Sequence, residues 1–565
     1  MSFRFVVPSD LRGALDAAAA DWQSNDKVAR FWKKDSTLWT QDGEEKWLGW
    51  TNIVERQQAD LAAFEALAAD VKASGFKTAL LLGMGGSSLC PEVLAVTFGT
   101  QAGFPEMHIV DSTDPAQVKA ARDKVDLAET LVVVASKSGS TLEPNVLKQY
   151  FFEEMVKAVG AEKAGSHFIA ITDPGSKMEQ VAKSDKFRKI FYGDPEIGGR
   201  YSALSNFGVV AATVAGLDTA KLLVEAAKAV ASAKNAPEKN PAVQLGLLMG
   251  LAHNTGRDKI TIFTSPEIYD LGAWLEQLIA ESTGKLGKGI TPVDREAIAP
   301  AAVYGKDRLI AYVRYAGTAD KDLDAKVAAL EAAGHPAVYF EIADLYEIFG
   351  QFFTWEVATA VAGSVMGINP FNQPDVESAK IETRALTSEY EKTGKLPERT
   401  AFLTESGIEL YATDGYAAKI KGETLIDTLK AHFAQLHAGD YFAALAFLPM
   451  FVEHEDAIQK LRHKVRDTKK VATCLGFGPR FLHSTGQDYK GGPNSGVFLQ
   501  ITADHAVDVE IPGQKYSFGI VIAAQAAGDL AVLEARGRRA LRVHLGKDVA
   551  AGLKTLVAAA DAALK

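Results

Sequence analysis

The chain has 565 residues, of which 47% are hydrophobic and 23% charged, and its formal net charge is −10. These values are typical of a globular protein of two to four domains, and the negative charge disfavours a nucleic-acid or anionic-membrane partner. The two cysteines, Cys90 and Cys474, are expected to be reduced and buried, as in a cytoplasmic protein. No secretion signal and no apolar run of membrane-spanning length is recognised, so we expect a cytoplasmic location.

The first part of the chain, residues 1–75, is predicted to form a helical cap. Apolar residues recur with helical spacing over residues 10–23 and again over residues 51–73. Between them lies a tryptophan-rich stretch, residues 31–50. Large aromatic side chains bury much apolar area, so packing against a domain is favoured over stacking on a ligand.

From residue 76 onward, short apolar runs alternate with helical segments, a pattern typical of parallel sheets with crossover helices. The runs TALLLG, MHIVD, LVVVAS and HFIAIT define a first unit, residues 76–235, which ends in a polar stretch. The runs DKITIFTS, DRLIAYVRY and PAVYFEI define a second, residues 236–395. The predicted fold class is therefore α/β, with two doubly wound parallel sheets.

The remaining residues, 396–565, are predicted to form a mixed α/β segment. A helix is expected in ETLIDTLKAHFAQL. Strands are expected in KKVATCLGF, GVFLQITA and SFGIVIAAQA.

Two loops follow apolar runs of the first unit, where ligands of such sheets bind. The first contains Gly83, Gly85 and Gly86, which allow close backbone approach, followed by Ser87. Ser88 stands where a dinucleotide motif needs its third glycine, so this loop alone is as consistent with a tight turn as with a binding site.

The second loop, residues 135–144, is rich in hydroxyls: Ser136, Ser138, Ser140 and Thr141 lie close together. Pro144 belongs in the first turn of a helix, which favours Thr141 as its N-cap. Free N–H groups and hydroxyls at a helix N-terminus favour phosphate. No Walker lysine follows, so a monophosphate suits this loop better than a nucleotide.

Four further residues are candidates for chemistry. Arg200 follows two glycines and could stabilise an oxyanion or form a surface ion pair. Glu281 shares a helical face with Gln277 and could act as a general base if buried, although an isolated glutamate is usually solvated. Lys380 lies in the second turn of a predicted helix, and His483 in a polar, glycine-rich loop. No histidine cluster has metal-ligand spacing, so no metal is predicted.

Together these segments resemble the glucose-6-phosphate isomerase family. Five motifs occur in the family's order: Gly83 to Ser87, Ser136 to Thr141, Gly198 to Ser202, Gln277 to Lys285, and Phe371 to Lys380. The tryptophan-rich stretch and the segment GPRFLHSTGQ are similar to the isomerase half of bifunctional transaldolase/glucose-6-phosphate isomerase proteins.

The resemblance implies two sugar-isomerase (SIS) domains of flavodoxin-like topology. It implies interconversion of D-glucose 6-phosphate and D-fructose 6-phosphate through a cis-enediolate, in glycolysis and gluconeogenesis, without a cofactor. It assigns proton transfer to Glu281, enediolate stabilisation to Arg200 and a part in ring opening to Lys380. It further implies a homodimer, with the active site at the subunit interface. The implied substrate contacts are Gly86, Ser87, Ser136, Lys137, Ser138, Thr141, Gln277 and Gln373.

The sequence departs from the family in two places. Asn372 stands where the family has aspartate, which removes a carboxylate of orienting or capping role. The family's ring-opening histidine lies between the glutamate and lysine motifs, where this chain has only His335, in a predicted turn. We therefore expect His483 to open the ring, from its own chain or from a partner subunit. The alternative is that Lys380 opens the ring alone.

Two rival functions remain at this point. One is a non-catalytic SIS protein that senses a sugar phosphate, and the other is an isomerase of a different phosphosugar, such as mannose 6-phosphate. The joint presence of Glu281, Arg200 and Lys380 favours an enzyme over a sensor.

Overall fold

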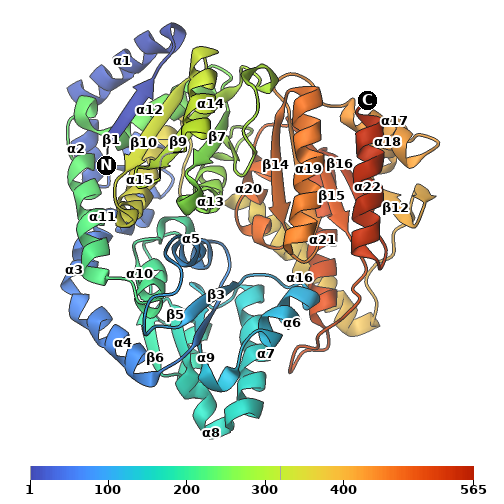
Figure 1. The fold of residues 1–565 in the computed structure, drawn as a ribbon, viewed down its shortest axis with the longest axis horizontal. Helices are drawn as coiled ribbons and strands as arrows, with labels where there is room; N and C mark the ends of the chain where they lie inside the picture. Colours follow the sequence, from blue (N-terminus) through green and yellow to red (C-terminus); the bar gives the residue numbers. More distant parts are fainter. Residues whose placement is uncertain (1, 319) are drawn as a thin grey trace.

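The computed structural model describes residues 2–318 and 320–565. Three β-sheets, each covered by helices, surround a centre where α5 (Leu89–Phe98) and α13 (Leu271–Thr283) meet (Figure 1). The alternating pattern of the sequence is thus confirmed as an α/β fold with parallel sheets.

The first sheet has the strand order β3-β2-β4-β5-β6 and is entirely parallel. Its central strands are buried along their whole length because helices cover both faces, which explains their continuous apolar runs. The strands are β2 (Thr78–Leu82), β3 (Glu106–Val110), β4 (Thr130–Ala135), β5 (Phe168–Thr172) and β6 (Lys189–Tyr192).

The second sheet has the order β1-β10-β9-β7-β8, and only the pairing of β1 with β10 is antiparallel. Strand β1 was not expected in the helical cap, and its partner lies more than three hundred residues away. The other regular elements of residues 1–75 are helices, of which the longer ones are α1 (Ser9–Ser24), α2 (Lys27–Trp32), α3 (Ile53–Ala59) and α4 (Leu61–Ser74). The strands are β1 (Ser2–Val6), β7 (Lys259–Thr264), β8 (Thr291–Val293), β9 (Arg308–Tyr315) and β10 (Ala337–Ile342).

The third sheet, drawn in orange to red in Figure 1, has the order β11-β12-β16-β15-β13-β14. Strands β16, β15, β13 and β14 are parallel, whereas β11 and β12 add an antiparallel edge. The strands are β11 (Leu403–Glu405), β12 (Ile408–Tyr411), β13 (Tyr441–Phe447), β14 (Ala472–Phe477), β15 (Gly496–Thr502) and β16 (Arg539–His544).

One predicted strand of this third unit is wrong. The segment SFGIVIAAQA opens α21 (Phe518–Ala535), whose N-terminus is capped by Ser517. The helix packs on α16 (Pro374–Thr393) and is apolar around most of its circumference. Its sequence therefore lacks the alternation of apolar and polar positions that distinguishes a helix from a strand. It is long and apolar enough to cross a membrane, with a mean hydropathy of 1.5, but 67% of it is buried inside the protein, as in a core helix.

The tryptophan-rich stretch packs beneath the turn that carries Arg200. Trp50 is fully buried and stacks on Tyr201 with ring centroids 5.1 Å apart. Trp39 meets Phe371 edge to face at 5.2 Å. These two side chains fit the packing interpretation.

Candidate active site

One cleft collects the loops that follow the carboxyl ends of the parallel strands, together with α13 and the start of α16. Its empty volume is about 1250 Å³ and it is open to solvent. All residues that the sequence singled out as catalytic or substrate-binding line this cleft: Gly86, Ser87, Ser136, Lys137, Ser138, Thr141, Arg200, Gln277, Glu281, Gln373, Lys380 and His483.

The first glycine loop forms a tight turn, Gly85–Ser87, directly after β2. A Cβ atom added to Gly86 would lie 2.0 Å from the carbonyl oxygen of Gly199, because the two glycine turns touch backbone to backbone. Gly86 is therefore required for the close approach that brings the Arg200 turn to the cleft.

The hydroxyl-rich loop leads into α7 (Leu142–Val159), with Thr141 at the N-cap as predicted. No side chain of the described residues caps this terminus, so the first-turn N–H groups are open to an anionic ligand. Ser136 Oγ is buried and has no hydrogen-bond partner among the described residues, while Ser138 Oγ lies 2.8 Å from Ser140 Oγ. Lys137 lines the same cleft, but its ammonium group is paired with Asp173.

Arg200 is only 2% exposed and its guanidinium is held on three sides, which excludes the surface ion pair considered from sequence. Nε donates to Ser282 Oγ at 2.7 Å and Nη1 to Gln373 Oε1 at 2.9 Å. Nη2 donates to the carbonyl oxygens of Pro370 (2.7 Å) and Asn372 (3.0 Å). This network fixes a permanent positive charge at the base of the cleft.

Glu281 lies in the last turn of α13 and is 8% exposed, so it is not the solvated residue that an isolated glutamate usually is. Its Oε1 lies 3.7 Å from Nη1 of Arg200. Its Oε2 accepts a hydrogen bond from Gln277 Nε2 at 3.2 Å, and the same amide donates to the carbonyl oxygen of His483 at 2.8 Å. Gln277 thus links the carboxylate to the third unit.

Asn372, the residue that replaces a family aspartate, keeps an orienting contact. Its side-chain Oδ1 accepts from Nζ of Lys285 at 3.0 Å, and the lysine also donates to the backbone oxygens of Asn369 and Asn372. Burial lowers the pKa of Lys285 well below its usual value, with the charge on Arg200 adding to the effect. The amide therefore retains the contact without supplying the counter-charge.

His483 lies at the end of a short turn, Arg480–His483, after β14, and lines the cleft of its own chain. Its Nε2 is 2.9 Å from Oε1 of Glu143, which is buried. Lys380 lies at the cleft edge, where Nζ donates to Glu377 Oε1 at 2.7 Å. His335, the alternative histidine, lies between α14 (Lys321–Ala332) and β10 and does not line the cleft.

Glu143 lies within the hydroxyl-rich loop but was not among the predicted site residues. It stands in the first turn of α7, a common position for acidic residues near a helix N-terminus, so its place there carries no specific signal. Glu143 is recognised as part of the site only by its contact with His483, which lies 340 residues away in the sequence.

Comparison with known proteins matches the chain to a family. The family model for phosphoglucose isomerase matches residues 65–302. The chain is 29% identical over 377 residues to glucose-6-phosphate isomerase of Rubrobacter xylanophilus, which covers 58% of this chain and 87% of that protein. It is 30% identical over 353 residues to probable glucose-6-phosphate isomerase of Methanococcus maripaludis, which covers 54% of this chain and 77% of that protein.

The chain belongs to the phosphoglucose isomerase family. Among solved structures, a hypothetical protein from Thermus thermophilus shares the fold, with a TM-score of 0.59 and 24% identity over 68% of this chain and 99% of that one. The phosphoglucose isomerase model includes Arg200 and Glu281 but ends at residue 302, before Lys380 and His483.

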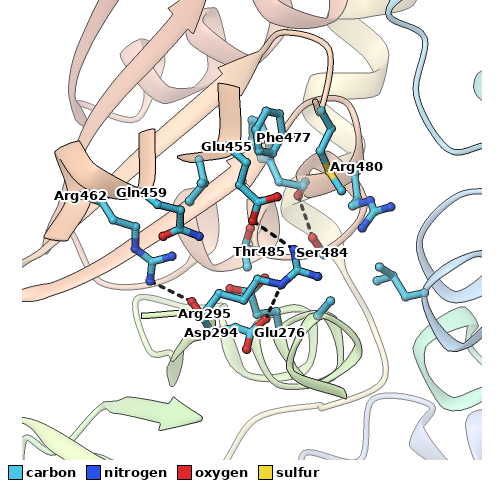
Figure 2. Close-up of a pocket in the computed structure, with 16 residues that line it drawn as sticks. Glu276, Asp294, Arg295, Glu455, Gln459, Arg462, Phe477, Arg480, Ser484 and Thr485 are labelled. Atoms are coloured by element: carbon cyan, nitrogen blue, oxygen red, sulfur yellow. Dashed lines mark hydrogen bonds and ion pairs between the residues drawn. The ribbon is translucent and has the colours of Figure 1, made fainter. Parts of the chain in front are cut away.

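Behind the His483 turn, this phosphoglucose isomerase family member has a partly buried junction of charged groups between its second and third units (Figure 2). Arg295 pairs with Glu455 (3.2 Å) and with Asp270. Arg462, from the opposite side, donates to the backbone oxygen of Asp294 at 2.9 Å. The lining also includes Glu276, the neighbour of Gln277 on α13.

The carboxyl groups of this junction hold protons to unusually high pH. Burial, reinforced by the charge on Asp294, raises the pKa of Glu276 to about 8. Burial likewise raises the pKa of Asp294 to about 6 and, together with the charge on Glu92, that of Asp270 to about 7. Because the folded state binds protons that the unfolded state releases, this junction loses stability as the pH rises from about 4.5 through these values.

Replacing Glu276 with glutamine should remove part of the decrease in the free energy of unfolding that accompanies rising pH. At pH 4 the free energies of unfolding of Glu276→Gln and the wild type should be nearly equal, since Glu276 is protonated in the folded state and largely protonated in the unfolded state. At pH 8.5 the variant should be more stable by about 1–3 kcal/mol, because the wild type must take up a proton on folding or bury the charge of Glu276. Urea denaturation across this range measures the difference. The exposed Glu453→Gln, on nearby α19 (Val452–Lys469), is the control, and a Glu276→Gln difference that does not grow with pH contradicts the assignment.

Proposed function

We propose that this chain interconverts D-glucose 6-phosphate and D-fructose 6-phosphate through a cis-enediolate, as an enzyme of glycolysis and gluconeogenesis that needs no cofactor. The observation that carries the proposal is the placement of Glu281 and Arg200, 3.7 Å apart, in the cleft that also contains the hydroxyl-rich loop. A base, a fixed positive charge and an anion site are the groups that this isomerisation requires. A non-catalytic sensor would need only the last of them.

Phosphate binding is assigned to the loop from Ser136 to Thr141 and the N-terminus of α7. Ser136 Oγ has no partner among the described residues and can donate to a phosphate oxygen. The open N–H groups of the first turn of α7 complement the negative charge. Gly86, Ser87, Gln277 and Gln373, which line the same cleft, are assigned to substrate contacts.

Proton transfer is assigned to Glu281. The carboxylate removes the C2 proton of the open-chain aldose, and the electrons move onto the carbonyl oxygen to form the enediolate. The guanidinium of Arg200, already oriented by its hydrogen bonds to Ser282 and Gln373, stabilises that oxyanion without further reorganisation. After proton exchange between the two enediol oxygens, Glu281 returns its proton to C1, which gives the ketose.

Ring opening is assigned to His483 and Lys380. The anomeric hydroxyl must lose a proton while the ring oxygen gains one, so the step needs an acceptor and a donor. A carboxylate can only accept hydrogen bonds, so Nε2 of His483 carries the hydrogen that points to Glu143, and Nδ1 is the nitrogen left for the sugar. Lys380 lines the same cleft.

Several finer assignments form part of the same proposal. A cytoplasmic location, assembly as a homodimer and the likeness to the isomerase half of transaldolase/glucose-6-phosphate isomerase proteins are inferred from the sequence. A dimer is not needed to bring His483 to Glu143, because both residues belong to one chain.

The proposal is tested by offering the purified chain glucose 6-phosphate and mannose 6-phosphate in parallel and following fructose 6-phosphate by NMR. We expect turnover of glucose 6-phosphate, with mannose 6-phosphate converted at least tenfold more slowly. Faster conversion of mannose 6-phosphate would assign the chain to the other epimer. Binding of either sugar phosphate without any turnover would support the sensor instead.

A further inference from the structure

Gln525 is a buried residue of α21 that lies behind the Glu143–His483 pair. Its side chain is 2% exposed. Its Nε2 donates to Glu143 Oε1 at 2.6 Å, the oxygen that also meets Nε2 of His483. Its Oε1 accepts from Thr113 Oγ1 at 2.6 Å. A chain of four polar groups, Thr113–Gln525–Glu143–His483, therefore runs from the loop after β3 to the cleft.

The contacts fix the orientation of the Gln525 amide. If the amide were flipped, its oxygen would face the Glu143 carboxylate, and two acceptors would meet in a buried site. In the observed orientation, Glu143 Oε1 receives one donor from Gln525 and one from His483. Hydrogen bonds to an ionised carboxylate are shorter and stronger than neutral ones, so this arrangement restrains the carboxylate.

Burial of Glu143 makes these donors important. Burial alone would raise the pKa of this carboxyl, but the charge and hydrogen bond of His483, with smaller contributions from a backbone hydrogen bond and the charge on Lys380, outweigh it and hold the pKa below its usual value. The other charged groups around the pair, Lys380, Glu377 and Arg384 on α16, line the same small cavity. In the part of the chain that the structure describes, none of these three side chains makes a hydrogen bond to Gln525.

We propose that Gln525 is a positioning residue for ring opening: it holds Glu143 so that the carboxylate orients His483 and sets the proton affinity of the pair. This inference rests on the proposed function and adds to it a role for α21, which belongs to the third unit. Thr113 supports the same role by fixing the amide.

The test compares the pH dependence of kcat for Gln525→Leu and Glu143→Gln with that of the wild type. Glu143→Gln removes the carboxylate charge, so His483 should bind its proton less tightly. The midpoint of the kcat profile that reports protonation of the His483–Glu143 pair should therefore move to lower pH. Gln525→Leu leaves the charge but removes a donor to it, so the same midpoint should move to higher pH by about one unit. Its kcat should fall about tenfold to a hundredfold, with KM within about threefold, since binding groups are untouched.

The matched control is Gln500→Leu, another buried glutamine of the third unit, whose Nε2 donates to Asp529 at 3.0 Å and to the backbone of α21. It should leave the midpoint unchanged. If Gln525→Leu does not fold, Thr113→Val supplies the readout, with a smaller shift of the same sign. Provided that the wild type is active, the proposal would be overturned if the midpoint of Gln525→Leu did not move. It would also be overturned if that midpoint moved to lower pH, as expected for Glu143→Gln. Absence of activity in the wild type would instead refute the proposed function, on which this inference depends.

Discussion

Replacing Glu281 with glutamine is expected to reduce kcat by at least a thousandfold while KM changes by less than about tenfold. The amide has nearly the same size and can still accept from Gln277, so the end of α13 should keep its shape. What disappears is the group to which we assign removal and return of the carbon-bound proton, and such a loss falls on the chemical step and not on binding. Steady-state kinetics in both directions measure it.

The control for this experiment lies on the same helix. Glu276→Gln alters a carboxyl group that faces the partly buried junction and does not line the cleft, so at pH 7 it should leave kcat within about twofold of the wild type. If Glu281→Gln retained more than a few per cent of the wild-type activity, Glu281 would not be the base.

A second large effect is expected from a single methyl group at Gly86. The Cβ of alanine would lie 2.0 Å from Gly199 O and 2.2 Å from its carbonyl carbon, and both are backbone atoms that cannot rotate away. The two turns must separate, which moves Arg200 from its hydrogen bonds. We expect Gly86→Ala to lower kcat/KM more than a hundredfold and the free energy of unfolding by about 1–3 kcal/mol.

Gly198 provides the matched comparison within the same pair of turns. A Cβ there would have no atom within 4 Å, and its φ of −67° suits any residue. Gly198→Ala should therefore keep the stability of the wild type and lose at most a few-fold in KM. Equal stability of the two variants in urea denaturation would show that the contact of Gly86 with Gly199 is not tight.

The loops of the cleft could be predicted because their signals are local. A hydroxyl-rich loop before a helix, or two glycines before Arg200, indicates a special backbone whatever surrounds it. Burial could not be predicted in this way: Glu281 and Arg200 acquire their setting only when α13 packs against the glycine turns.

The features of the fold and of the site that could not be predicted from the sequence depend on contacts between residues far apart in the chain. The strand expected at residue 517 onward is the helix α21, because a segment buried on nearly all sides has no polar face to mark its period. Glu143 and Gln525 are 382 residues apart, and although Glu143 lies within the hydroxyl-rich loop, nothing in either segment points to the other. Their contact follows from how the third unit docks on the first.

The most direct test of the account follows the carbon-bound hydrogen itself. Glucose 6-phosphate deuterated at C2 is converted in ordinary water, and the label at C1 of fructose 6-phosphate is measured by NMR or mass spectrometry. Proton transfer by Glu281 through an enediolate predicts that a part of the deuterium, or all of it, is lost to water, and that Glu281→Gln abolishes both conversion and loss. Complete retention of the label at C1 in the wild type would contradict the account, because a deuteron held by Glu281 in a cleft open to solvent must exchange in part with water.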